Sequence, residues 1–139
     1  MERPENVISL EDARKRLRDR TRKRAINFDL YGSDKLHTFL VDILGEDNEL
    51  ARVFIPSDNP RPMARLKISR KDIDQIAGIL LQERDEFKRR SVGESLVELH
   101  NYFVMQGGMS SGNDGFNEFC ISHFGRDRKQ ILLISRNEQ

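Results

Sequence analysis

The sequence predicts an α+β domain with about five helices packed on a small, mainly antiparallel sheet of three to four short strands. Two observations support this class. Apolar residues recur at helical spacing in several segments, and short runs of alternating apolar and polar residues lie between them. Two of these runs are neighbours in the chain and two stand apart, which differs from the regular strand–helix alternation of a doubly wound sheet.

Length and composition predict one domain. A chain of 139 residues buries roughly two thirds of the surface that it exposes when unfolded. We expect residues 1–8 to be a flexible N-terminus and residues 9–139 to form the domain. Cys120 is the single cysteine, so no internal disulfide forms and no disulfide-linked partner is expected. No signal-peptide core and no long apolar run is present, so we expect a cytoplasmic protein without a membrane partner.

The N-terminal segment is expected to be helical. Ser9 and Asp12 match a capping box that opens a helix over about residues 10–24. Apolar and polar residues then alternate over residues 26–30, which predicts a short, half-buried strand.

The next elements are a helix and a hairpin. Ser33 is expected to cap a helix over about residues 34–44, which Gly45 ends. Residues 51–55 and 64–68 each alternate in polarity, and a proline-rich loop separates them. This arrangement predicts a β-hairpin with a long loop.

Two further capping boxes are expected to open helices. Ser69 with Asp72 predicts a long helix that continues to about Arg89. Ser91 with Glu94 predicts another helix. Its residues that are expected to face inward are Leu96, Leu99 and Phe103.

The C-terminal part is predicted to be loop, helix and strand. Residues 107–115 form a loop rich in glycine, serine and asparagine. A short phenylalanine-rich helix follows and ends at Gly125, and residues 131–135 are expected to form a buried strand.

Charge is unevenly distributed although the net charge is only +1. Residues 1–25 carry +4, residues 26–60 carry −5 and residues 61–139 carry +2. Such segregation bears on partners and association rates rather than on fold.

The densest charge is the run ARKRLRDRTRKR over residues 13–24, which holds eight basic residues and one acid. Guanidinium groups pair with phosphate oxygens through two hydrogen bonds and stack on bases, and six of the eight cations are arginines. In general type the run resembles arginine-rich segments that bind RNA. The leading hypothesis is a small regulatory protein that contacts nucleic acid, either RNA or DNA, through this helix. The expected contact residues are Arg14, Lys15, Arg16, Arg18, Arg20, Arg22, Lys23 and Arg24.

Two other interpretations of the arginine-rich helix stay open. It could bind an acidic protein surface by charge complementarity, as in an adaptor, inhibitor or immunity-type module. It could also be a solvated face, or dock on the chain's own acidic stretch at residues 29–58. The deciding feature is whether its guanidinium groups are exposed or paired with the chain's own carboxylates.

Motifs that suggest catalysis are weak, and we expect no enzyme, no cofactor and no metal site. Residues 108–112 fit G-x-S-x-G around Ser110, but that motif needs a strand-to-helix turn in a hydrolase sheet. The same loop lacks the lysine of a nucleotide-binding loop. Cys120 and His123 share a helix face, yet zinc requires at least three protein ligands. Glu46 and Asp47 are expected to lie in a solvated acidic turn.

Overall fold

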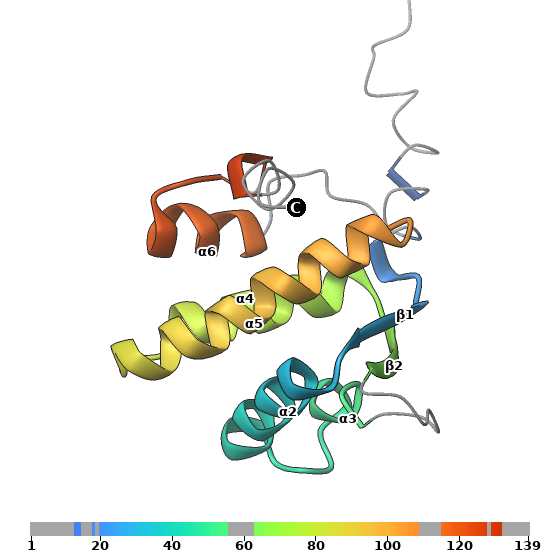
Figure 1. Cartoon of the computed structure of the whole chain (residues 1–139), viewed down its shortest axis with the longest axis horizontal. Coiled ribbons are helices and arrows are strands. Elements are labelled where there is room, and N and C mark those ends of the chain that lie inside the picture. Colours follow the sequence, from blue (N-terminus) through green and yellow to red (C-terminus); the bar gives the residue numbers. More distant parts are fainter. Residues whose placement is uncertain are drawn as a thin grey trace, which may run out of the picture.

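The computed structural model describes residues 13–14, 18, 20–55, 63–108, 115–127 and 129–131. In this part of the chain α4 and α5 form a central layer, with α6 on one side and α2 and the sheet on the other (Figure 1). The elements are β1 (Arg24–Asp29), α2 (Leu30–Leu44), α3 (Glu49–Arg52), β2 (Met63–Ile68), α4 (Arg70–Leu81), α5 (Glu86–Met105) and α6 (Gly115–Phe124). The predicted α+β class is confirmed.

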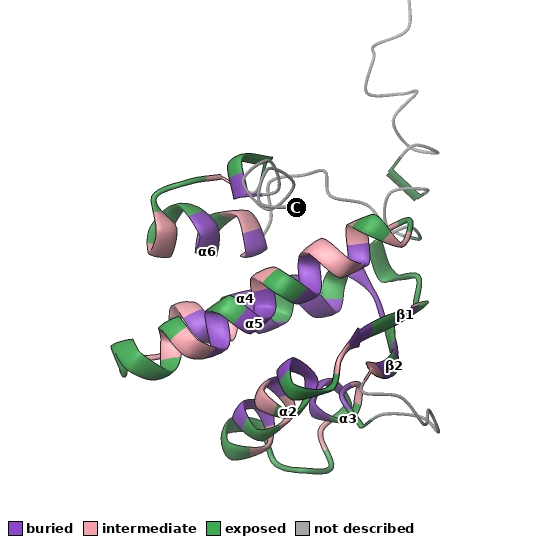
Figure 2. Ribbon diagram, viewed as in Figure 1, coloured by how far each residue is buried: buried purple, intermediate pink, exposed green. Residues whose placement is uncertain are grey.

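The sheet has two strands in the described residues, not the expected three to four. β1 and β2 are antiparallel, and their register pairs Arg24 with Ile68 at one end and Asp29 with Met63 at the other. Alternate residues of both strands point into the core (Figure 2), as the polarity of the sequence predicted. The buried ones are Ile26, Phe28, Ala64, Leu66 and Ile68.

The strand predicted at residues 51–55 is wrong, because this segment begins in helix α3 and continues as a turn. The Asn48 side chain caps α3 by accepting a hydrogen bond from the Leu50 amide at 2.8 Å. Ala51 and Phe54 are both fully buried, a spacing of about one helical turn. β2 therefore pairs with β1 and not with this segment.

α2 begins earlier than predicted, because Asp29 and not Ser33 is its N-cap. The Asp29 carboxylate accepts a hydrogen bond from the Gly32 amide at 2.9 Å. Ser33 is buried inside the helix, and its hydroxyl donates to the Phe54 carbonyl at 3.3 Å, which joins α2 to the turn after α3. The predicted end at Gly45 is confirmed by a φ of 89° there.

The capping box at the start of α4 is confirmed. The Asp72 amide donates to the Ser69 hydroxyl at 3.2 Å, and the Ser69 amide donates to the Asp72 carboxylate at 2.9 Å. α4 ends at Leu81 and not near Arg89. Asp85 then caps α5 by accepting a hydrogen bond from the amide of the third helical residue at 3.1 Å.

The helix start predicted at Ser91 and Glu94 is wrong, because both residues lie inside α5. The actual start is Glu86, which follows the stronger cap at Asp85. The predicted inward face of this helix is confirmed: Leu96, Leu99 and Phe103 are buried.

α6 is present as predicted, and Gly125 follows it with a φ of 71°. Its buried residues are Phe116, Phe119 and Cys120. Ile131 is helical, so the strand predicted over residues 131–135 is wrong at its first residue, and residues 132–135 lie outside the described part of the chain.

A buried ionic cluster joins α4, α5 and α6. Arg70 and Asp74 are both buried, with 3.6 Å between Nε and Oδ1. Arg70 Nη1 lies 3.4 Å from His100 Nε2, and the Phe116 amide donates to Asp74 Oδ1 at 3.2 Å. The His100 ring stacks on the Phe116 ring, with 4.1 Å between centroids. The cluster therefore fixes where α6 begins.

The side chain of Gln106, just after α5, binds the open edge of β1. Its Oε1 accepts from the Asn27 amide at 2.8 Å, and its Nε2 donates to the Asn27 carbonyl at 2.9 Å. The carboxamide thus makes the two hydrogen bonds that a neighbouring strand would make at this point.

Replacing Gln106 by alanine is expected to lower the free energy of unfolding by about 1 kcal/mol, since exposed hydrogen bonds contribute modestly. Hydrogen exchange of the Asn27 amide should become faster, and urea unfolding measures the stability change. Gln75→Ala is the matched control, because Gln75 is exposed on α4. Unchanged exchange at Asn27 would contradict the edge contact.

Candidate nucleic-acid interface

The basic segment at residues 14–24 lies where α4 begins and α5 ends (Figure 1). Its helix ends before Arg24, contrary to the prediction, because Arg24 is the first residue of β1. Lys15 and Arg16 lie outside the described residues. The described helical residues are Ala13, Arg14, Arg18, Arg20 and Thr21.

Two cations of the segment are ion-paired with the first turns of α4. Lys23 Nζ lies 2.6 Å from Asp72 Oδ2, and Arg20 Nη2 lies 3.4 Å from Asp74 Oδ2. The two carboxylates are largely buried, whereas both cations are about half exposed. Asp72 also serves the capping box of α4, so Lys23 adds a charge-assisted contact to a carboxylate that is already held in place. These pairs dock the segment on the domain.

Arg24 is also a docking residue. Its Nη2 donates to the Gln106 carbonyl at 3.2 Å, at the end of α5, where unpaired carbonyls carry partial negative charge. Gly107 has a φ of 100°, and a Cβ built there would lie 2.5 Å from the guanidinium. Glycine at this position leaves room for Arg24.

Arg14, Arg18 and Arg22 behave differently. All three are exposed, and none forms an ion pair with a carboxylate in the described residues. The predicted contact residues therefore divide into cations that dock the segment and cations that face solvent.

A second group of cations lies on the outer face of the sheet. Arg65 and Lys67 alternate with buried residues of β2 and are exposed. The register places them opposite Asn27 and Ala25, which are the exposed residues of β1. The polarity of β2 alone could have indicated this basic face, since both of its outward residues between Ala64 and Ile68 are cations.

Arg52 joins this face from α3. It lines a hollow of about 270 Å³ whose other lining residues are Ala25, Val53, Ile55, Arg65, Leu66 and Lys67. Among the described residues, no acidic side chain lines this hollow. The sequence could not indicate Arg52, because its segment was expected to be a strand. We call the exposed cations of both groups the basic surface: Arg14, Arg18, Arg22, Arg52, Arg65 and Lys67.

One group of exposed acids lies on α2 and on the turn and short helix that follow it: Asp34, Asp42, Glu46, Asp47 and Glu49. Other exposed acids, such as Glu94 and Glu118, lie on α5 and α6. Figure 1 shows α2 and the N-terminal helical residues at opposite ends of the view, with the α4–α5 layer between them. Glu49 and Arg52 share α3, so this acidic group meets the basic surface there, whereas the N-terminal arginines lie on the other side of the α4–α5 layer.

Three residues had suggested other chemistry: Ser110, Cys120 and His123. Ser110 lies outside the described residues. Cys120 is fully buried, and the His123 ring stacks against the Phe119 ring at 5.2 Å. Among the residues that the structure describes, no three His, Cys, Asp or Glu side chains are placed to hold a metal ion.

Comparison with known proteins finds no relative: no family model, no curated protein and no solved structure matches the chain. In the described residues, no helix is both long and apolar enough to cross a membrane. Function must therefore be inferred from the surface and its charges.

Proposed function

We propose that the chain is a small regulatory protein that binds nucleic acid, RNA or DNA, through the basic surface. One observation carries the proposal. Among the described residues, Arg52 of α3 and Arg65 and Lys67 of β2 line one hollow without an acidic side chain, and the exposed arginines of the N-terminal segment precede β1, whose Ala25 lines the same hollow. Five of the six are arginines, whose planar guanidinium groups match phosphate oxygens. The proposal includes no catalytic step.

Phosphate contact is the proposed mode of binding. None of the described residues that line the hollow on the sheet is aromatic, so they do not form the stacking platform of proteins that read unpaired bases. Phosphate contacts position a protein without reading sequence. If each of the six cations binds one phosphate of a duplex, the logarithm of the association constant falls with the logarithm of salt concentration with a slope of about −5.

The docked cations have a separate role in this proposal. Arg20, Lys23 and Arg24 are held by α4 and by the end of α5. They orient the segment against the domain, so that Arg18 and Arg22 approach the phosphates from a supported position. Preorganisation of this kind reduces the entropy that binding must overcome.

A protein-interaction module is the second candidate. The observation that favours it is a hollow of about 420 Å³ between α2 and α5, lined partly by Tyr31, Phe39 and Val92. Tyr31 beside it is 72% exposed, and Phe87 at the start of α5 is 82% exposed. Exposed aromatic side chains are enriched at protein interfaces.

Charge reversal tests the first proposal. We expect the double variant Arg18→Glu/Arg22→Glu, and separately Arg52→Glu/Lys67→Glu, to weaken binding of labelled duplex DNA and single-stranded RNA by at least about tenfold at low salt. The salt slope should fall by about 2 in each double variant, because two phosphate contacts are lost. Fluorescence anisotropy over a salt series measures both quantities.

The control is Arg84→Glu/Arg126→Glu, which changes net charge equally at two exposed arginines outside the basic surface. It should bind almost as well as the wild type, and all variants should melt close to it, since exposed substitutions alter stability by about 0.5 kcal/mol or less. Equal weakening in the control, or no salt-dependent binding by the wild type, contradicts the proposal. Capture of an acidic protein that survives nuclease treatment would favour the second candidate.

A further inference from the structure

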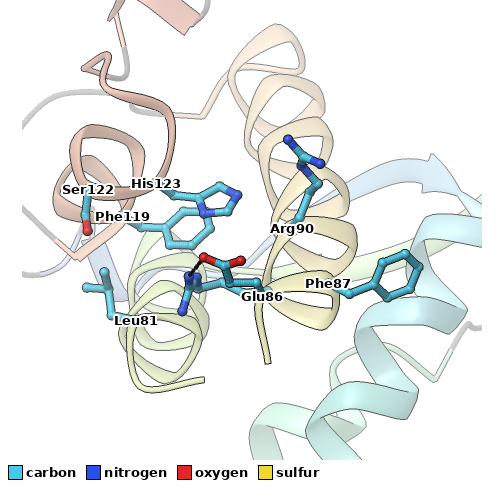
Figure 3. A pocket seen from close by; sticks show the side chains of 8 residues that line it. Leu81, Glu86, Phe87, Arg90, Phe119, Ser122 and His123 are labelled. Carbon is cyan, nitrogen blue, oxygen red and sulfur yellow. Dashed lines mark ion pairs between the residues drawn. The ribbon is translucent and has the colours of Figure 1, made fainter. Parts of the chain in front are cut away.

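A cavity of about 670 Å³ opens where α4 ends, α5 begins and α6 ends. Its lining residues are Leu81, Glu86, Phe87, Arg89, Arg90, Phe119, Ser122 and His123. Figure 3 shows Glu86, Phe119 and His123 gathered near its centre, Arg90 on the α5 wall, and Phe87 directed away from them. The basic segment docks at the other end of α5, which at 1.5 Å per residue lies roughly 30 Å away. The cavity is therefore a separate place on the molecule.

Two carboxylates near the cavity have cationic partners. Arg89 Nη2 lies 3.9 Å from Glu86 Oε1, and Lys88 Nζ lies 3.8 Å from Glu83 Oε1. Arg89 is also held by the Glu83 carbonyl, to which its Nη1 donates at 2.6 Å. Arg90 has no ion-pair partner in the described residues, so its positive charge remains for a ligand.

The His123 imidazole is affected by burial and by the charges around the cavity. Burial, and after it the Arg89 and Arg90 guanidinium groups, lowers the pKa of His123 below its usual range. Glu94 and Glu86 act in the opposite direction and are outweighed. The remaining cavity residues, on α4 and α6, are uncharged at neutral pH. The imidazole is consequently neutral at that pH in a positive environment, and an anion bound beside it would make its protonation more favourable.

The cavity also has apolar surface, although less of it than polar surface. Phe119 is fully buried and its ring is nearly parallel to that of His123, with an angle of 9° between the planes, so it supports the imidazole and is not itself accessible to a ligand. A flat apolar group can contact Leu81, half-buried at the end of α4, and the His123 ring. A ligand that combines a strong anion with such a group matches positive charge on one side and these surfaces on the other.

We propose that this cavity binds a small phosphomonoester, with its phosphate between Arg90 and His123 and its organic part against Leu81 and the His123 ring. Arg90 donates two parallel hydrogen bonds to the phosphate oxygens, as guanidinium groups do with phosphates generally. The Ser122 hydroxyl at the rim is available as a further donor. This site does not depend on the nucleic-acid proposal, because it uses none of the residues of the basic surface.

The test is titration of the full chain with phenyl phosphate, followed by NMR of the imidazole signals. The chain has three histidines, so His123→Gln assigns the signal of interest. We expect a saturable shift of the His123 signal and a rise of the His123 pKa on binding. Arg90→Gln should weaken this binding about tenfold, whereas Arg84→Gln, the matched control, should leave it within about twofold. Inorganic phosphate should bind about tenfold more weakly, because it lacks the ring.

Three results would overturn the proposal. One is the absence of a His123 shift at roughly 10 mM phenyl phosphate, which corresponds to negligible affinity. Another is unchanged affinity in Arg90→Gln while amide spectra show that the variant is folded. The third is a His123 shift caused only by an oligonucleotide with a 5′-phosphate, which would assign the cavity to nucleic-acid ends. Loss of DNA binding in the charge-reversal variants would leave these three results unaffected, because those variants change no residue that lines the cavity.

Discussion

Replacing Asp74 by alanine is expected to lower the free energy of unfolding by about 3–5 kcal/mol. The Asp74 and Arg70 side chains are only 5% and 3% exposed, so the substitution leaves a buried guanidinium without its carboxylate. It also removes the acceptor of the Phe116 amide at the start of α6. Urea denaturation followed by circular dichroism measures the change.

Arg20→Ala is the control for this substitution. Arg20 pairs with the same carboxylate but its side chain is 52% exposed, so its loss should change stability by only about 0–1 kcal/mol. Asp74→Asn keeps the volume and an acceptor oxygen while removing the charge, and it separates the ionic contribution from packing. The prediction is contradicted if the free energy of unfolding of Asp74→Ala lies within about 1 kcal/mol of the wild-type value, because a buried pair is expected to contribute more. The ionic cluster would then not be what holds α6.

Gly115→Ala is expected to destabilise the protein by about 1–3 kcal/mol through overpacking. A Cβ at Gly115 would lie 2.7 Å from the backbone carbonyl oxygen of Asp74. Because that atom belongs to the backbone of α4, no side-chain rotation relieves the clash, and α6 must move away from α4. Thermal unfolding and the near-ultraviolet signal of the packed aromatic residues both report this change.

Gly78→Ala is the matched substitution with the opposite expected sign. Gly78 lies inside α4, and no atom lies within 4 Å of a Cβ built there. Alanine in a helix interior is favoured over glycine by about 0.5–1 kcal/mol, so this variant should be more stable than the wild type. If Gly78→Ala and Gly115→Ala lower the stability equally, close packing of α6 on α4 does not explain the loss of stability in Gly115→Ala.

Elements whose signals are local in sequence could be predicted. The alternation in β1 and β2 indicated the buried face of each strand, and the phenylalanine spacing indicated the core side of α6. The capping box at Ser69 and the stop at Gly45 were recognisable because each depends on a few adjacent residues.

Elements that depend on contacts distant in the chain could not be predicted. Residues 51–55 alternate in polarity, yet the structure exposes Ile55 and buries Ala51 and Phe54. The hydrogen bond from the Ser33 hydroxyl to the Phe54 carbonyl contributes to this arrangement, and no local pattern reveals it. The same holds for Asp85, which begins α5 where a longer α4 was expected, because several candidate caps compete within a few residues.

The candidate site was predictable only in part. The run of arginines identified the segment, but which cations dock and which face solvent depends on Asp72, Asp74 and the end of α5. The alternation of polarity in β2 placed Arg65 and Lys67 on the outer face of the sheet. Arg52 lies on α3, a helix where the sequence had predicted a strand. Charge density alone therefore cannot separate docking residues from contact residues.

The exposed acids of α2 and the exposed arginines of the N-terminal segment lie on opposite sides of the α4–α5 layer, while the net charge of the chain is only +1. Two charge groups held apart in this way form a dipole, on which an external field exerts a torque even when the net charge is small. Near a polyanion this torque favours orientations in which the arginines lead, over a range set by the screening length of about 8 Å at physiological salt. In the proposed function, this bias raises the share of encounters that begin in a productive orientation.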